Sequence, residues 1–307
     1  MPGVITTGNF AKDLVPGVKT WFQTKYKEYP IEYLDIFEKN TSIRAFEEEA
    51  GITGFGLAAI KAEGDGIRYD DTEQGYLSRY THITYGLGFI ITREMYEDGI
   101  AVTKALRKAG ALAFSIRQTK ETIGGNVLNR AFTAAYTMGA NSDGKELCAD
   151  DHPNKTGGTW RNELSTAADL SEAALEQACI DIAALTTDRG LKIAIRPMKL
   201  IIPTALEFDA YRILKSIGRV DSANNDINAL RASGKIPQGV AVNHYLTDVD
   251  AWFLKTDCPD GVKYMERRAD AFGSENDWDT ENAKFKATFR GSFGWSDPRG
   301  MFGSPGA

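Results

Sequence analysis

The sequence predicts an α+β fold, and three long segments with different patterns lead to this prediction. Residues 93–132 contain no proline and place apolar or small side chains at helical spacing, among them Val102, Leu106 and Ala109. Residues 46–92 instead combine β-prone runs with frequent glycine, as strands and turns do. Residues 165–255 contain both helical and strand patterns. A long helix, a β-rich excursion and a helix-on-sheet unit therefore make up most of the chain.

The composition is that of a soluble globular protein with one large domain or two smaller ones. The 307 residues are 42% hydrophobic and 25% charged, with a net charge of −6. This acidic balance argues against a broad basic nucleic-acid face but leaves room for a local patch. Any contact with DNA is therefore expected to be weak.

No segment indicates export or membrane insertion. The first ten residues lack the basic and apolar regions of a signal peptide, and no uninterrupted apolar run is long enough to cross a bilayer. The three cysteines, Cys148, Cys179 and Cys258, are odd in number and far apart, so we expect reduced thiols. These features predict a protein that is made and used in a cytoplasm, without a membrane partner.

Residues 1–45 read as an N-terminal arm. Three prolines separate several aromatic residues, and a short helical pattern lies at 18–27. Such a segment is suited to lie across another surface that buries its rings. We therefore expect Trp21 and Phe22 to contact a neighbouring subunit. The alternative is an N-terminal helix that docks on the core of its own chain.

Residues 46–92 are predicted to form a long two-stranded excursion. The sequence Glu63-Gly64-Asp65-Gly66 contains the Asp-Gly signal of a hairpin turn. An isolated hairpin is marginally stable in water, and no nearby segment offers a surface for it. We therefore expect this surface to belong to a neighbouring subunit.

Charged residues gather near the turn of this excursion. We expect them to pair with another subunit or to remain solvated, and an exposed ion pair contributes only about 0 to 1 kcal/mol. The residues are Lys61, Glu63, Asp65, Arg68, Asp70 and Asp71.

The helix predicted over residues 93–132 is long for a domain of this size, since forty residues span roughly 60 Å. Such a rod favours a protein that touches its neighbours. The alternative is a core helix with a kink at Gly110 or at Gly124-Gly125.

Residues 133–164 are rich in Asn, Asp, Gly and Pro and read as an irregular connection. Connections of this length are usually functional or disordered. Cys148, Asp150, Asp151 and His152 are the nearest approach to a metal cluster, but their spacing matches no standard zinc pattern. We predict no metal site and no cofactor.

The second half of the chain predicts a helix-on-sheet unit. We expect a helix at 169–189, capped by Asp169 or Ser171 and ended by Gly190, and a second helix that begins at Thr204. Strands are expected at 199–202, 239–243 and 251–255, and a short helix at 225–231. Further strands are expected at 262–267 and 284–293, before a turn-rich C-terminal segment.

Motifs of catalysis are missing from the sequence. Gly51, Gly54 and Gly56 have the wrong spacing for a dinucleotide fingerprint, and neither a P-loop nor a Gly-x-Ser-x-Gly elbow occurs. His82, His152 and His244 stand in no motif that names a catalytic partner, and we expect His244 to be structural. The sequence thus predicts no catalytic residues and no enzyme.

Several stretches resemble the Mu-like major head subunit family. They are KLIIPTALEFDAYRILKS, NDINALRASGKIP, VAVNHYLTDVDAWFLKTD, KYMERRAD and SFGWSDPRGMFGSPGA. This similarity covers at least residues 165–307. Over residues 1–164 only the order of elements is similar, namely to the Hong Kong 97-like fold of tailed-bacteriophage major capsid proteins.

The resemblance implies a division of the chain. Residues 1–45 would be the N-arm, 46–92 the extended β-hairpin loop, and 93–164 the peripheral domain with its spine helix. Residues 165–255 would form the axial domain, and 256–307 the return strands of the peripheral domain.

The resemblance also implies a function. The chain would be a major capsid protein that self-assembles into the hexamers and pentamers of an icosahedral phage shell, passing through a procapsid that matures around packaged double-stranded DNA. Its partners would include a portal protein, a separate scaffolding protein or protease, and a decoration protein. It would assemble in the cytoplasm of a bacterial host and end in the virion.

Two departures and two alternatives accompany this resemblance. The chain begins with a short arm where many relatives carry a charged scaffolding segment, and no partner asparagine identifies Lys61 as a crosslinking residue. An encapsulin-like compartment shell, which encloses an enzyme, is the first alternative. A soluble enzyme with its active site in residues 133–164 is the second.

Overall fold

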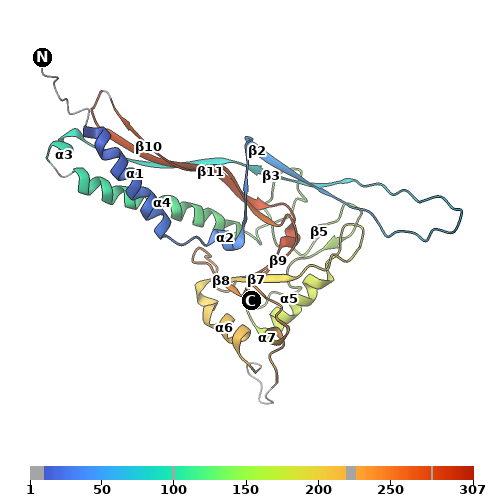
Figure 1. Cartoon of the computed structure of the whole chain (residues 1–307). Helices are drawn as coiled ribbons and strands as arrows, with labels where there is room; N and C mark the ends of the chain where they lie inside the picture. The colour runs from blue at the N-terminus through green and yellow to red at the C-terminus, as the bar shows by residue number, and fades with distance from the viewer. Residues whose placement is uncertain (1–9, 99–100, 219–225, 278) are drawn as a thin grey trace.

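Two four-stranded sheets organise the chain, one in an elongated upper layer and one in a triangular lower unit (Figure 1). The computed structural model describes residues 10–98, 101–218, 226–277 and 279–307. A long loop projects from the region where the two units meet (Figure 1). The chain therefore has the mixed α+β architecture that the sequence predicts.

The upper sheet has the strand order β1-β10-β11-β4. β1 runs parallel to β10, whereas β10 and β11, and β11 and β4, are antiparallel. The strands are β1 (Glu38–Thr41), β4 (Ile83–Ile91), β10 (Val262–Asn276) and β11 (Ala283–Trp295). The two C-terminal strands occur where the alternating pattern predicts them, and both are longer than expected.

β4 lies outside the two-stranded excursion to which the sequence pattern assigned it. Its Tyr85 stacks on Phe289 and its Phe89 stacks on Phe285, both from β11. These ring contacts bury aromatic surface that a free hairpin would leave in water. The prediction of a hairpin that extends to residue 92 is therefore wrong.

Two helices replace the single rod predicted at 93–132. They are α3 (Arg93–Glu97) and α4 (Ala101–Asn129), and α4 alone spans about 43 Å. α4 continues as a helix through Gly110, Gly124 and Gly125, where the sequence allowed a kink.

The glycines of α4 lie where other segments approach the helix closely. A Cβ at Gly124 would lie 3.2 Å from Cβ of Tyr33, and one at Gly125 would lie 2.8 Å from Cβ of Tyr245. These glycines therefore allow close packing.

The N-terminal arm is mainly helical and packs on its own chain. α1 (Phe10–Glu28) lies along α4, and the short α2 (Tyr33–Ile36) follows it. Phe22 is only 3% exposed and packs against Phe272 of β10, so the prediction that it contacts a neighbour is wrong for this conformation. The alternative of a helix docked on its own core holds. Trp21 is 40% exposed, and its predicted contact stays a prediction.

The lower sheet has the order β12-β9-β7-β8 and is covered by short helices. The strands are β7 (Pro197–Ile202), β8 (Val240–Val242), β9 (Trp252–Thr256) and β12 (Met301–Ser304). The helices are α5 (Glu172–Ala184), the 3-10 turn Thr204–Leu206, α6 (Glu207–Lys215) and α7 (Ala229–Ser233). The core of this unit is apolar and includes Trp252, Leu254 and Phe302.

Three details of the lower unit differ from the sequence-based expectation. Ser171 caps α5 by accepting the N–H of Ala174, but α5 ends at Ala184, well before the expected stop at Gly190. The C-terminal segment forms β12, which pairs with β9, because Phe302 completes the lower core. Residues 256–307 therefore contribute to both sheets. The short helix expected at 225–231 begins later, at Ala229, and residue 225 lies outside the described part of the chain.

β2 (Phe46–Ile52) and β3 (Gln74–Thr81) form an antiparallel pair at the root of the projecting loop, which comprises residues 53–73. The N–H of Asp65 donates to the carbonyl of Ala62 over 3.2 Å, and Gly64 has a φ of +88°. A turn therefore occurs within the predicted stretch, but its central residues are Glu63 and Gly64 instead of the Asp-Gly pair, and the limbs that lead to it are not paired strands. A further small ladder joins β5 (His152–Pro153) to β6 (Thr159–Trp160).

No helix among the described residues has the length and apolarity needed to cross a membrane.

Candidate functional site

The projecting loop, residues 53–73, exposes large apolar side chains along both limbs. Leu57 is 84% exposed and Tyr69 is 91% exposed, and Phe55, Ile60 and Ile67 are exposed as well. Soluble monomers rarely expose apolar side chains that are so closely grouped, and such groups mark interaction sites. The loop is thus the first candidate for a functional surface.

The predicted charged residues of the loop fall into two groups. Lys61, Glu63, Asp65 and Arg68 are exposed and lie near the turn. Asp70 instead accepts the N–H of Gly56 across the loop over 2.9 Å, and this hydrogen bond is the main cause that lowers the pKa of its carboxyl.

The second limb of the loop is also tied to the lower unit. The Arg189 guanidinium donates to the backbone carbonyl of Asp71 over 2.6 Å and lies 3.7 Å from the Asp70 carboxylate. Asp70 and Asp71 therefore help to orient the loop within its own chain. The sequence pattern did not reveal Arg189 as their partner, since it is more than a hundred residues away.

A buried lysine holds the root of the loop. Lys263 Nζ, on β10, lies 2.6 Å from the carboxylates of both Glu49 and Asp260. Burial lowers the pKa of Lys263, but the hydrogen bonds to Asp260 and Glu49 outweigh burial and raise it. Glu49 also accepts from the hydroxyl of Ser296, which in turn lies 2.7 Å from the hydroxyl of Tyr80. The loop therefore extends from a rigid base.

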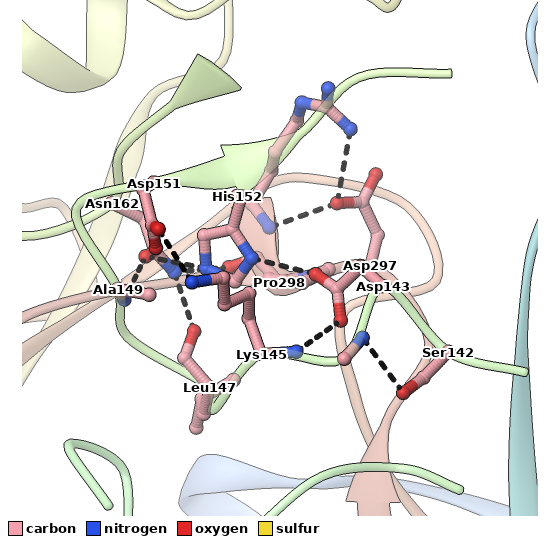
Figure 2. Close-up of polar contacts among 12 residues, drawn as sticks. Ser142, Asp143, Lys145, Leu147, Ala149, Asp151, His152, Asn162, Asp297 and Pro298 are labelled. Carbon is pink, nitrogen blue, oxygen red and sulfur yellow. Dashed lines mark hydrogen bonds and ion pairs between the residues drawn. The ribbon is translucent and has the colours of Figure 1, made fainter. Parts of the chain in front are cut away.

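The irregular connection at 133–164 contains a buried polar cluster around His152 (Figure 2). The imidazole Nδ1 lies 2.7 Å from the Asp143 carboxylate, and Nε2 lies 3.0 Å from Oδ1 of Asn162. The ring also stacks on Trp160. Both nitrogens are therefore engaged with acceptor oxygens.

Asn162 joins this connection to the C-terminal segment. Its side-chain N–H groups donate to the carbonyls of Leu147, Pro298 and Met301, at 2.7, 2.9 and 2.9 Å, and its Oδ1 accepts the N–H of Ala149. Figure 2 shows these contacts converging on one amide. The sequence pattern missed Asn162 and Asp143, because neither stands in a recognisable motif.

The other residues of the considered metal cluster point to separate partners. Asp151 pairs with Lys145 at 2.5 Å, and Cys148 is fully buried, which raises the pKa of its thiol. No group of metal-ligating side chains with suitable geometry occurs among the described residues. The cluster is arranged to hold backbone segments together.

A cavity of about 480 Å³ lies between the root of the loop, the connection and the C-terminal segment. Its acidic lining residues include Asp188 and Asp297, and the Arg299 guanidinium lies 3.3 Å from the first and 3.5 Å from the second. The carboxylates near Arg299 are thus compensated within the chain.

The remaining two histidines also have structural partners. His82 is buried between the hydroxyls of Ser42 and Ser292, and burial, then nearby Arg290, lowers its pKa. Nδ1 of His244 donates to the Glu32 carboxylate over 2.8 Å. The prediction of a structural His244 is confirmed.

The upper sheet leaves one of its faces uncovered. Phe285, Ala287 and Phe289 of β11 point toward α1 and α4, so their neighbours in the strand point away from these helices. This uncovered sheet face consists of Thr84, Gly86, Gly88, Ile90, Arg268, Ala271, Gly273, Glu275, Lys284, Lys286, Thr288 and Arg290. It is therefore shallow at its centre, where glycine and alanine flank Lys286, and cationic at the end that carries Arg268 and Arg290. At the other end Lys284 lies opposite Glu275 and forms an ion pair with Asp277.

One comparison with known proteins identifies a family, and another identifies the fold. A family model described as phage capsid protein matches residues 76–303. The capsid of cyanophage P-SCSP1u is 9% identical, with a TM-score of 0.55 over 91% of this chain and 88% of that chain. A structure from Mycobacterium phage Patience is 12% identical, with a TM-score of 0.52 over 99% and 89%.

A third structure, a phage-related protein from Bordetella bronchiseptica RB50, is 12% identical, with a TM-score of 0.52 over 92% of this chain and 95% of that chain. No curated protein matches the sequence. At these identities the structural likeness concerns the fold, and the family model carries the evidence for function.

Proposed function

This chain belongs to the phage capsid protein family and is a major capsid protein of an icosahedral, phage-type shell, and we propose that the projecting loop joins its copies. It has the Hong Kong 97-like capsid fold and is a structural component of the virion, not an enzyme. The resemblance to a capsid family and fold is thereby confirmed, while the narrower similarity to the Mu-like head subunits stays a prediction. The family match favours a phage head over an encapsulin-like compartment.

The exposed apolar side chains of residues 53–73 are the observation that carries this proposal. They extend away from both units, where the chain itself has no surface to cover them (Figure 1). Burying an apolar side chain of this size stabilises a contact by roughly 1.5 to 3 kcal/mol. A neighbouring copy that covers the loop therefore supplies much of the free energy of assembly.

The uncovered sheet face of a neighbouring copy is the surface that suits the loop. The loop carries five acidic residues and two basic ones between positions 53 and 73, whereas the sheet face presents Lys286, Arg268 and Arg290. The shallow centre of that face admits the exposed rings and aliphatic side chains. Opposite charge at the edges of such a contact sets its register and orientation.

Further contacts would close the shell. The lower unit exposes Phe208, Tyr211 and Ile217 around its narrow end, and we assign these side chains to the contacts within hexamers and pentamers. The assignment of residues 165–255 to an axial domain rests on the same reasoning. We also propose a portal protein, a separate scaffolding protein or protease and a decoration protein as partners of the shell, with double-stranded DNA inside it.

A loop with polar substitutions tests the role of its apolar side chains. The variant Leu57→Ser, Ile60→Ser, Tyr69→Ser should remain folded by circular dichroism but sediment as small species. The matched control, Leu57→Met, Ile60→Val, Tyr69→Phe, keeps the apolar surface and should form shells like the wild type. Shells formed equally well by the polar variant would refute the proposed role.

Charge reversal tests the receiving surface. Glu63→Lys with Asp65→Lys in the loop, or Lys286→Glu with Arg290→Glu on the sheet face, should each reduce shell formation in electron micrographs. Combining the two pairs should restore it, because the complementary charges are then exchanged. If all of these variants fold but the combined variant forms no more shells than the two double variants, the loop contacts a different surface.

A further inference from the structure

The helical side of the upper layer is basic although the whole chain is acidic. The net charge is −6, yet residues 99–120 contain five cations and no carboxylate. α1 adds Lys19, Lys25 and Lys27, and Glu28 forms an ion pair with Lys25. Positive charge is therefore concentrated on two adjacent helices.

Two of these cations serve the interior of the chain. Arg117 is buried over the ring of Tyr26, and Lys120 is buried and lies 2.8 Å from the Asp270 carboxylate. They anchor α1 and α4 to the sheet.

The other cations are exposed and form what we call the cationic helical face, although Lys108 Nζ also donates to the carbonyl of Ile90 over 3.3 Å. Its members are Lys19, Lys27, Lys104, Arg107 and Lys108, and all are exposed. No ion pair within the described ranges involves any of them. This face lies on the opposite side of the upper sheet from the uncovered sheet face (Figure 1).

The two helices enclose a shallow groove within this face. The groove has a volume of about 460 Å³ and is lined by Trp21, Lys25, Thr103, Leu106 and Arg107, among others. The exposed side chains between Lys19 and Lys27 are neutral, namely those of Thr20, Trp21, Gln23 and Thr24. Lysine, arginine, threonine and glutamine are the residue types that contact phosphate oxygens of nucleic acids.

We propose that the cationic helical face binds the phosphodiester backbone of double-stranded DNA, without sequence preference, and therefore lines the inside of the shell. This inference rests on the proposed function, since it assumes a shell that encloses DNA. The two sides of the upper sheet would then have different partners. The uncovered sheet face would contact a neighbouring copy, and the cationic helical face would contact DNA.

The nature of the face favours a duplex over an acidic peptide. Its cations are flexible side chains spread over two helices, and the groove between them is shallow, so it offers no deep pocket for an anchoring side chain. Contacts of this kind are individually weak, and their affinity falls with salt in proportion to the number of phosphates neutralised. Many copies in a shell would hold DNA through many such contacts, each of which can break and reform.

Binding of a fluorescent 30-base-pair duplex to the purified chain tests the proposal directly. Anisotropy at increasing salt gives the slope of log Kd against log salt. Arg107→Gln with Lys108→Gln should reduce the magnitude of this slope by about 2, because each lost phosphate contact contributes about 1. Lys215→Gln with Lys235→Gln, which remove the same charge from exposed sites of the lower unit, should leave the slope unchanged.

Three results would overturn the proposal. The first is that the duplex does not bind at low salt. The second is that the Arg107/Lys108 variant and the Lys215/Lys235 variant reduce the salt slope equally. The third is that polyglutamate, added at the same concentration of charge, binds in preference to the duplex and displaces it. Loss confined to Lys284→Gln with Lys286→Gln would place DNA on the other face and also count against it.

Electron microscopy separates this inference from the proposed function. Arg107→Gln with Lys108→Gln should still form shells of wild-type appearance, since both side chains come from α4, away from the loop, and Lys108 touches β4 only at the backbone carbonyl of Ile90. A wild-type chain that binds duplex but forms no shells would contradict the proposed function alone. Shells that form normally but show no DNA contact would contradict the inference alone.

Discussion

The Nδ1 atom of His152 lies 2.7 Å from the Asp143 carboxylate, and the ring is completely buried. Its Nε2 faces Oδ1 of Asn162, whose own N–H groups are directed at three backbone carbonyls. This arrangement fixes the orientation of the amide and gives each ring nitrogen a polar partner. A pair that resembles part of a catalytic triad therefore serves to hold the connection at 133–164 in place.

Removal of the central amide should destabilise the fold strongly. Asn162→Ala removes a donor from three carbonyls, of which that of Pro298 keeps the N–H of Met301, and an acceptor from one N–H. Each buried group left unsatisfied costs about 1 to 3 kcal/mol. We expect a loss of at least about 3 kcal/mol in the free energy of unfolding, measured by urea denaturation. The control Asn141→Ala, at an exposed side chain, should change it by less than about 0.5 kcal/mol. Similar values for the two variants would contradict the role of Asn162.

Stability should decrease as the pH rises through the titration of Glu121. Burial raises the pKa of this carboxyl to about 7, although the N–H groups of Tyr33 and Glu32 donate to it and lower the pKa in part. The folded state therefore binds the proton more tightly than the unfolded state, so stability is lost between the unfolded pKa of 4.5 and about 7. The loss amounts to about 3 kcal/mol, since one pKa unit corresponds to about 1.4 kcal/mol.

The comparison of wild type with Glu121→Gln isolates this effect from other titrating groups. Denaturant unfolding at pH 5 and pH 7.5 should show a smaller decrease for the variant. The carboxyls of Asp151 and Asp277, whose pKa values are lowered by their lysine partners, affect stability only at pH values below this range in both proteins. An identical pH dependence in both would exclude Glu121 as the source.

Breaking the buried ion pair between α4 and β10 should cost more than removing it entirely. Asp270→Ala leaves the Lys120 ammonium, which is 1% exposed, without its counter-charge, and such losses amount to about 3 to 5 kcal/mol. The double variant Lys120→Met, Asp270→Ala should recover part of this loss. The exposed pair Asp209–Arg212 provides the control, since Asp209→Ala should cost less than about 0.5 kcal/mol. Additive losses in the double variant would show that the two side chains act independently.

Two glycines of α4 should respond in opposite ways to alanine. A Cβ at Gly125 would lie 2.8 Å from Cβ of Tyr245, so Gly125→Ala should destabilise the chain by about 1 to 3 kcal/mol. At Gly110 the nearest atom would be 3.6 Å away, so Gly110→Ala should stabilise the helix by about 0.5 to 1 kcal/mol. Thermal unfolding of the two variants distinguishes these outcomes. A lower melting temperature for both would mean that the groove beside Gly110 cannot accept a methyl group.

Local sequence patterns predict much of the secondary structure. The helical spacing of residues 93–132, the turn within residues 63–66 and Ser171 as a helix cap all depend on neighbours within a few residues. Each has its counterpart in the structure, although the turn centres on Glu63 and Gly64 and not on the Asp-Gly pair. The capsid family could also be inferred from local sequence, because the resembling stretches contain the lower sheet and its helices.

Tertiary structure alone decided the contacts between distant segments. β4 pairs with β11 instead of forming part of the predicted hairpin, because its Tyr85 and Phe89 stack on rings of β11, some 200 residues away. Phe22 is buried in its own chain because it packs against Phe272. Asn162 gained its role from carbonyls at 147, 298 and 301. The sequence by itself determined which segments are helical, extended or exposed, since those preferences are set by adjacent residues. Which surface each segment buries depends on contacts between residues far apart in the sequence. Only the tertiary structure therefore shows that α1 and α4 cover the sheet of their own chain, whereas the loop at 53–73 stays exposed.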